Sequence, residues 1–286
     1  MDLNTLGLKI ARSENLPVLN NVVTQVLKTA DDPSASARSL ERIIERDPAL
    51  TAKILRVANS SFYGQTNVNS IARAISVLGM NTIRSLVVGV AYQQILATHS
   101  NAAAFNRLAF WKNSLATAVA ARIIMKLKQP LKSEEMYVAG MMAGVGVLVL
   151  DKFLPQKLDL ALKTAAERNI PLHIAEREVL GYDHGDIGAL LAEKSRLSES
   201  IISGIRYANS PFDDRKNFLV AGSVAAALAI AGKIGYTPDG RPATEELDLE
   251  LFAALEIAEG QIEPIASVVE GEVQRSSEAF GVQAAA

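Results

Sequence analysis

The spacing of apolar residues constrains the fold of this chain more than any other feature. In the stretch DPALTAKILRVAN, apolar side chains beginning with Leu50 and Ile54 recur at intervals of three and four, which places them on one face of a helix. Asp47 is the expected N-cap of this helix, with Pro48 at its first position. No stretch alternates apolar and polar residues persistently enough to indicate a half-buried strand. The sequence therefore predicts an all-α fold.

A glycine joins the next two predicted helices. The sequence SIARAISVLG places Ser70 at the N-cap of one helix and Gly79 at its left-handed end, and Asn81 opens another helix that runs to about Leu96. A helix, a turn and a second helix also make up the helix-turn-helix of DNA-binding proteins. The second helix here carries only Arg84 as a cation, whereas phosphate contacts demand clustered basic residues. We therefore favour a packed helical hairpin over a DNA reader.

Two apolar runs invite comparison with membrane spans. Residues 136–150 have about the length of a buried core helix and fall short of the roughly 20 residues needed to cross a bilayer. Ser133 is the expected cap of this helix. Residues 219–234, rich in Ala and Gly, are expected to form a helix buried among other helices. The N-terminus has no uninterrupted apolar segment of signal-peptide type, so we expect neither secretion nor a membrane span.

Composition excludes several classes of function. The chain has no cysteine, which rules out disulfides, thiolate nucleophiles and cysteine metal sites and is typical of a reducing cytoplasm. Its 29 Lys and Arg residues stand against 31 Asp and Glu residues, for a net charge of −2. No global positive field draws the chain to nucleic acid or anionic lipid. We expect a cytoplasmic protein that does not bind a membrane and for which nucleic acid is an unlikely partner.

The predicted helices fall into two lobes. The stretch HSNAAA, residues 99–104, marks the boundary between an N-terminal helical lobe, residues 1–104, and a second helical lobe, residues 105–286. Within the second lobe, TPDGRPATEELD contains a Pro-Asp-Gly turn and is expected to form a long exposed loop before a helical tail. The fold prediction is thus a two-lobed helical bundle.

Several sequence blocks in a fixed order resemble one known family. ERDPALTAKILRVANSSFYG is followed by SIARAISVLGMNTIRSLVVG, by WKNSL, by AGMMAGVG and by GYDHGDIG. Together they are similar to the HDOD family, bacterial all-α domains related to the HD and HD-GYP metal-dependent phosphohydrolases. The resemblance covers about Leu16 to Pro211 and implies an HD-like second lobe. It also implies a signal-transduction or regulatory module.

The chain departs from the metal-binding pattern that this relationship implies. Where relatives with a metal have a His after the Trp, WKNSL has Asn113, whose neutral amide is a poor ligand for transition metals. Where relatives have the paired His and Asp, AGMMAGVG has Ala143 and Gly144, which carry no donor atom. The run from Phe218 to Tyr236, which matches the later Asp-bearing helix, contains no acidic residue. A catalytic metal site needs several convergent ligands and an open position. We therefore expect no metal, no cofactor and no catalytic residue.

Asp183 and His184 remain at a position where the family carries a His. One interpretation is a relic contact for a metal or ligand. The interpretation that we favour is the first turn of a helix, with Asp183 as its cap and Asp186 at the positive end of its dipole. His173 and His99 match no ligand spacing and are expected to be structural or surface residues.

The vestigial site consists of Asn113, Ala143, Gly144, Asp183 and His184. Replacing bulky ligands with Ala143 and Gly144 removes side-chain volume, and neighbouring helices close such space only partially. Either Met141, Met142 and nearby leucines have filled the space, or a cleft remains beside Asn113, Asp183 and His184. We favour the filled core, because interiors pack densely and Met adapts to irregular gaps.

The block RVANSSFYG allows two interpretations. Its polar residues and aromatic rings can end a helix and pack back on the core, with a glycine at positive φ. The block can also form a recognition surface for a partner. The residues of that candidate surface are Arg56, Asn59, Ser60, Phe62, Tyr63 and Gly64.

The prediction for function follows from these observations. We expect a non-catalytic module for signal transduction or regulation that acts through protein partners in a bacterial signalling pathway. A nucleotide-like small ligand is a further candidate partner. The alternatives are a residual metal-dependent phosphohydrolase of the HD superfamily and a helix-turn-helix protein that binds nucleic acid.

Overall fold

The computed structural model describes residues 1–13, 20–29, 32, 34–60, 63–64, 67–97, 99–244 and 246–282. Every regular element within these ranges is a helix, so the predicted all-α class is confirmed. The elements, in chain order, are α1 (Leu3–Arg12), α2 (Asn21–Lys28), α3 (Ala37–Ile44), α4 (Pro48–Ala58), α5 (Ile71–Leu78), α6 (Met80–Gln94), η1 (Ile95–Ala97), α7 (Arg107–Lys128), η2 (Pro130–Lys132), α8 (Ser133–Met142), α9 (Val145–Phe153), α10 (Pro155–Arg168), α11 (Leu172–Leu180), α12 (His184–Lys194), α13 (Glu199–Arg206), η3 (Pro211–Asp213), α14 (Phe218–Lys233), α15 (Leu249–Ala254) and α16 (Glu259–Ala279).

Local capping explains where several of these helices begin and end. Asp47 caps α4 by accepting a hydrogen bond from the backbone of Leu50 over 2.9 Å, as predicted. Ser70 likewise caps α5, and Gly79 ends that helix with a φ of +83°. The prediction for Ser133 is wrong, because Ser133 is the first residue of α8 rather than its cap and its hydroxyl donates to the preceding turn.

The predicted helix at residues 136–150 is divided into α8 and α9, which meet at Ala143 and Gly144. Gly140 lets α8 approach α7 closely, since a Cβ there would lie 2.8 Å from the carbonyl oxygen of Thr117. Within the described residues, the stretch from Pro130 to Phe153 is long and apolar enough to cross a membrane, but 83% of its most apolar window is buried inside the protein. Helices α5 and α6 would form a second such stretch only across a bend of 119°. That no segment spans a membrane stays a prediction.

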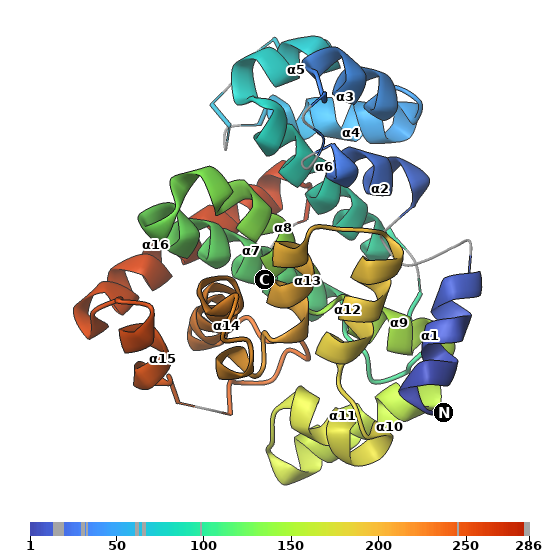
Figure 1. The fold of residues 1–286 in the computed structure, drawn as a ribbon, viewed down its shortest axis with the longest axis vertical. Coiled ribbons are helices and arrows are strands. Elements are labelled where there is room, and N and C mark those ends of the chain that lie inside the picture. Colours follow the sequence, from blue (N-terminus) through green and yellow to red (C-terminus); the bar gives the residue numbers. More distant parts are fainter. Residues whose placement is uncertain are drawn as a thin grey trace.

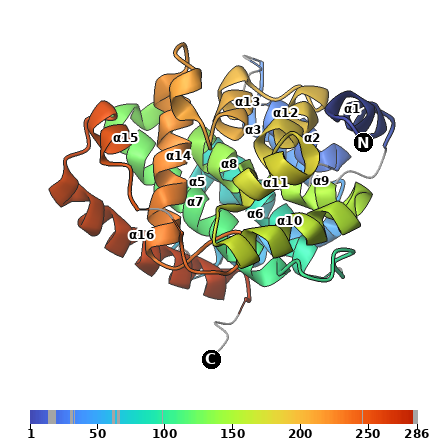
Figure 2. The ribbon, with the colours of Figure 1, turned by 90° about the horizontal axis from the view of Figure 1, so that it is seen from below.

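The helices gather in two groups that α6 connects. Helices α2 to α5 lie together at the top of Figure 1, and α6 runs from them into the larger group, where it contacts α8. In the larger group α7 is central and packs against α8, α14 and α16 (Figure 2). Helix α1 packs against α12, within the larger group. A lobe boundary at residues 99–104 stays a prediction, and α1 is the element that lies across it.

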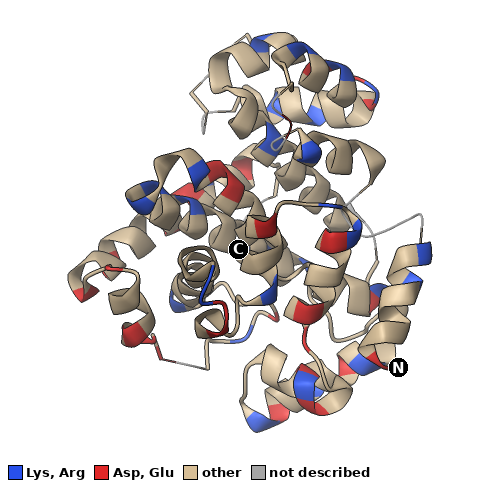
Figure 3. Ribbon diagram, in the orientation of Figure 1, with Lys and Arg blue, Asp and Glu red and all other residues tan. Residues whose placement is uncertain are grey.

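Helix α6 is buried along most of its length. Arg84, the one cation of the predicted second helix, is only 8% exposed. Its guanidinium donates to the side-chain and backbone oxygens of Thr29, at the end of α2, and to the side chain of Asn81. These contacts give Arg84 a structural role in the helical hairpin. Acidic and basic residues are interspersed over the described chain, without a basic stripe on α6 (Figure 3).

Candidate functional site

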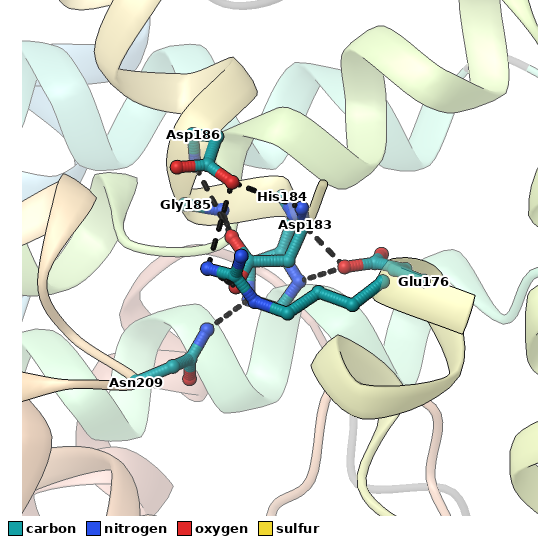
Figure 4. A network of polar contacts seen from close by, with 7 residues as sticks. Glu176, Asp183, His184, Gly185, Asp186 and Asn209 are labelled. Atoms are coloured by element: carbon teal, nitrogen blue, oxygen red, sulfur yellow. Dashed lines mark hydrogen bonds and ion pairs between the residues drawn. The ribbon is translucent and has the colours of Figure 1, made fainter. Parts of the chain in front are cut away.

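The first turn of α12 forms the centre of the vestigial site (Figure 4). Asp183 caps this helix: its Oδ1 accepts from the backbone N–H groups of Gly185 and Asp186, over 2.8 and 3.1 Å. The side chain of Asp186 accepts in return from the backbone of Asp183. Arg177 on α11 pairs with Asp183 at 2.8 Å. The favoured interpretation of Asp183 as a helix cap is therefore confirmed.

His184 is buried and forms a tight pair with Glu176 of α11. Its Nδ1 lies 2.6 Å from Oε2 of Glu176, and its backbone N–H donates to the same oxygen over 2.8 Å. Burial lowers the pKa of His184, but the Glu176 carboxylate and then Asp183 raise it by more than burial lowers it. The resulting pKa is about 9, above the ordinary value of 6.5. The imidazole is then protonated on both nitrogens at neutral pH, and its charge balances that of Glu176. Nδ2 of Asn209 lies 3.4 Å from the second nitrogen, Nε2. Two N–H groups cannot bond to each other, so hydrogen bonding to the protonated imidazole requires Asn209 to present its amide oxygen instead.

The positions of the three other vestigial residues hold few donor atoms. Asn113 on α7 is buried, and its Nδ2 donates to the backbone carbonyl of Tyr236 over 2.8 Å. Ala143 and Gly144 provide no side-chain donor, and a Cβ at Gly144 would lie 2.9 Å from the ring of Phe110. Within the described residues no group of three or more His, Asp or Glu side chains could hold a metal ion. That the metal centre of HD relatives is replaced in this chain stays a prediction.

A cavity of about 420 Å³ lies beside His184. Asn113, Gly144 and His184 line it, whereas Asp183 and Ala143 do not. Our preference for a filled core is therefore wrong, although Met141 and Met142 are fully buried as expected. The chain segment after α14 forms one wall of this cavity. Its volume lies within the range of small-molecule sites.

Residues within 237–244 and 246–248, in the predicted exposed loop, form one wall of the cavity. Arg241 holds this loop in place by donating to the backbone carbonyls of Ala165 and Ile170, over 2.7 and 3.0 Å. Asp239 accepts from the same guanidinium at 2.7 Å. Arg241 thus fixes the loop against the end of α10, and the loop lines the cavity while Gly240, Pro242 and Ala243 are exposed as predicted.

Three residues of this region did not emerge from the sequence as part of a site. Glu176 follows Ala175 on the apolar face of its helix, and a carboxylate on a buried face is a signal that could have pointed to a buried partner. His173, expected to be a structural or surface residue, lines the cavity. Burial, followed by the charge of His184, lowers the pKa of His173 to about 4. Arg241 lies in a loop, and nothing in the sequence of that loop indicates that it lines a cavity.

The candidate recognition surface lies in the N-terminal group of helices, and none of its described residues lines the cavity. Asn59 ends α4: its amide nitrogen donates to the carbonyls of Leu55 and Val68, and its oxygen accepts from the backbone of Val68, each over 2.8 Å. The hydroxyl of Ser60 donates to the carbonyl of Val57 over 2.6 Å. These contacts match the structural interpretation of the block.

The rest of the same block divides between core and surface. Tyr63 packs against the hydrophobic core, where burial, followed by Tyr137, raises its pKa. Gly64 has a φ of +61°, as expected for a turn. Arg56 is exposed, and Phe62 lies outside the described residues. A role of the block in recognition stays a prediction.

Comparison with known proteins places this architecture in a family. The model of the HDOD domain matches residues 16–211. The fold is similar to that of an HDOD domain protein of unknown function from Geobacter sulfurreducens, with a TM-score of 0.78 and 21% identity over 99% of this chain and 100% of the other. It is also similar to a protein from Shewanella amazonensis SB2B described as a proposed phosphohydrolase, with a TM-score of 0.73 and 24% identity over 96% and 97% of the two chains.

A sequence relative extends the comparison. An uncharacterized protein from Treponema pallidum (strain Nichols) is 24% identical over 215 residues, which are 72% of this chain and 41% of the relative. The chain therefore spans less than half of that protein. The family match covers all the sequence blocks that carry the resemblance, from RVANSSFYG to GYDHGDIG. The chain belongs to the HDOD domain family.

Proposed function

We propose that this HDOD protein is a non-catalytic regulatory module of the cytoplasm. It acts through protein partners in a bacterial signalling pathway, and it holds a small ligand in the cavity beside His184. The observation that carries this proposal is the chemistry of the former ligand positions. Asn113 is engaged with the backbone of Tyr236, and Ala143 and Gly144 have no donor side chain. A hydrolytic metal needs several anionic or imidazole ligands at one point.

The state of His184 supports the same proposal. Its Nδ1 is committed to Glu176, so only Nε2 faces the cavity side. A protonated Nε2 donates a hydrogen bond but cannot coordinate a metal or accept a proton as a general base. The residue can therefore orient a bound molecule without activating water.

A residual phosphohydrolase of the HD superfamily is the alternative. Metal analysis of the purified protein, combined with hydrolysis assays on phosphomonoesters and cyclic dinucleotides, separates the two. We expect no stoichiometric iron, manganese or zinc and no turnover above that of the variant His184→Ala. One equivalent of metal together with turnover that His184→Ala abolishes would establish the enzyme instead.

The regulatory part of the proposal needs a separate experiment. Native affinity capture followed by mass spectrometry reports retained proteins and small molecules together. We expect a protein partner whose retention changes when the cavity is filled by the variant Ala229→Trp, because Ala229 lines the cavity from α14. The variant Ala166→Trp, on the exposed face of α10, is the matched control. Retention that is the same in all three proteins would contradict a link between cavity and partner.

A further inference from the structure

The charges around the cavity restrict what it can bind. Among its described lining residues, Asp239, Glu246 and Asp248 are acidic and only Arg241 is a permanent cation. A site for a phosphate normally presents unpaired Arg or Lys side chains, or a helix N-terminus with free N–H groups. A phosphate would bind in this cavity only if an unpaired cation or a free helix N-terminus faced it.

Arg241 cannot serve as that group. Its guanidinium is already bonded to the Asp239 carboxylate and to the backbone carbonyls of Ala165 and Ile170. Binding a phosphate there would require breaking contacts that fix the cavity wall. Asp248 caps the N-terminus of α15 through the backbone N–H groups of Glu250 and Leu251, so that helix end is occupied as well. The N-terminus of α11 also lines the cavity, at Leu172 and His173, and has no side-chain cap. The partial positive charge of this helix end faces three carboxylates in the same lining, those of Asp239, Glu246 and Asp248.

The histidines add no net charge to the cavity. His184 and Glu176 together form a buried pair whose charges cancel. The low pKa of His173 leaves its imidazole neutral at pH 7. The surrounding field is therefore neutral to negative, which opposes a phosphate.

The inner surface suits a different kind of molecule. Leu172, Ala225, Leu228 and other apolar side chains form most of this wall. Neutral hydrogen-bonding groups interrupt it at Asn113, whose Oδ1 accepts no hydrogen bond from the described part of the chain, and at Asn209. The carboxylate of Glu246 is exposed, and water screens its charge.

We propose that the cavity takes an uncharged, partly apolar organic molecule with hydrogen-bonding groups and disfavours ligands that carry a phosphate or another strong anion. The inference rests on the proposed function, because it names the ligand class of the same cavity. The ligand class proposed for the cavity resembles the heterocyclic part of the expected nucleotide-like ligand, without its phosphate.

A matched pair of fluorescent probes tests the inference. N-phenylnaphthylamine is uncharged, and anilinonaphthalene sulfonate has the same aromatic core with a sulfonate added. We expect saturable binding of the uncharged dye, with binding of the sulfonate at least about tenfold weaker, which corresponds to about 1.4 kcal/mol. Neither inorganic phosphate nor adenosine monophosphate should displace the uncharged dye.

Variants assign the binding to this cavity. Ala229→Trp and Gly232→Leu should each abolish binding of the uncharged dye, and Ala166→Trp should not. A Cβ at Gly232 would meet only Ala243, at 3.4 Å, so this second variant keeps the test available if the bulkier one does not fold. Circular dichroism of each variant reports whether its helices are intact.

Asp239→Asn tests the charge argument itself. The amide oxygen can still accept from the Arg241 guanidinium, but the guanidinium loses its neutralising partner. Because this ion pair is largely buried, with 24% of the Arg241 side chain and 9% of the Asp239 side chain exposed, binding of the sulfonated dye should strengthen about threefold or more. Equal or tighter binding of the sulfonate by the wild-type protein would overturn the inference and leave the proposed function standing. If neither dye shows saturable binding, this inference is wrong, and so is the part of the proposed function in which the cavity holds a small ligand.

Discussion

The Nδ1 atom of His184 lies 2.6 Å from Oε2 of Glu176, and the backbone N–H of His184 donates to that same oxygen over 2.8 Å. Two donors from the first residue of α12 thus converge on one buried carboxylate oxygen of α11. The other oxygen, Oε1, is buried and has no hydrogen-bond partner among the described residues. The carboxylate therefore depends on the imidazolium charge for its stabilisation, and the pair couples the stability of the protein to pH.

The first prediction concerns alkaline pH. The pKa of His184 is about 9 in the folded protein against 6.5 for the free side chain, so folding favours the protonated form. This contribution is fully present below pH 6.5 and is lost as the pH rises through 9. The free energy of unfolding, measured by urea denaturation, should fall by about 2 to 3 kcal/mol across that window.

Glu176→Gln is the control for this prediction. The amide removes the charge that raises the pKa of His184, so the variant should be less stable at pH 6.5 and should show little further loss toward pH 9. A wild-type profile that is flat between these values, or a variant that keeps the full slope, would contradict the assignment.

The second prediction concerns mildly acidic pH. The pKa of His173 is about 4 in the folded protein, below its ordinary value, because burial and the charge of His184 oppose protonation. The unfolded chain therefore binds this proton first, and stability falls as the pH drops from 6.5 toward 4. Titration of the imidazole resonances by NMR should place His173 near 4 and His184 near 9. His173→Gln should reduce the acid slope, and two histidines that titrate together near 6.5 would exclude the proposed arrangement.

Features that depend on neighbouring residues could be predicted from the sequence. The caps Asp47, Ser70 and Asp183 and the left-handed end at Gly79 each involve groups within a few positions of one another. The wrong prediction of a cap at Ser133 also concerns residues close together in the chain. The short helix η2 directly precedes α8, so Ser133 already lies inside α8. Local patterns thus determined helix type well and one boundary poorly.

The cavity could not be predicted in this way, because it depends on residues far apart in the chain. Asn113 meets the backbone of Tyr236 across 123 positions, and Arg241 reaches back to α10 across 76. The packing of Ala143 and its methionine neighbours gives no indication of the wall that the loop after α14 contributes. Since Ala143 does not line the cavity, Ala143→Phe should disturb the junction of α8 and α9 without filling the cavity.

The third prediction concerns the contact between α9 and α12. A Cβ at Gly146 would lie 2.0 Å from the backbone carbonyl oxygen of His184, a group that cannot move aside alone. Gly146→Ala should therefore destabilise the protein by about 2 kcal/mol or more and displace His184 from Glu176. Gly260→Ala is the matched control, because the added Cβ would meet no described atom within 4 Å apart from its chain neighbours and its own helix backbone. Alanine is also the better helix former, so stability should be unchanged or slightly higher. Thermal denaturation of both variants provides the comparison, and equal effects would show that the α9–α12 contact is not tight.

The last prediction separates a structural role of Arg84 from DNA recognition. Its guanidinium is buried and bonds to both oxygens of Thr29, which ties α6 to the end of α2. Removing it leaves a buried carbonyl and a buried hydroxyl without their donor, so Arg84→Ala should lower the free energy of unfolding by about 1 to 3 kcal/mol. Binding to duplex DNA, measured by fluorescence anisotropy at physiological salt, should be weak and without sequence preference in both proteins. The exposed Arg73 on α5 supplies the control, since Arg73→Ala should change neither stability nor binding. Nanomolar binding of one duplex that Arg84→Ala abolishes, with a steep salt dependence, would instead make α6 a recognition helix.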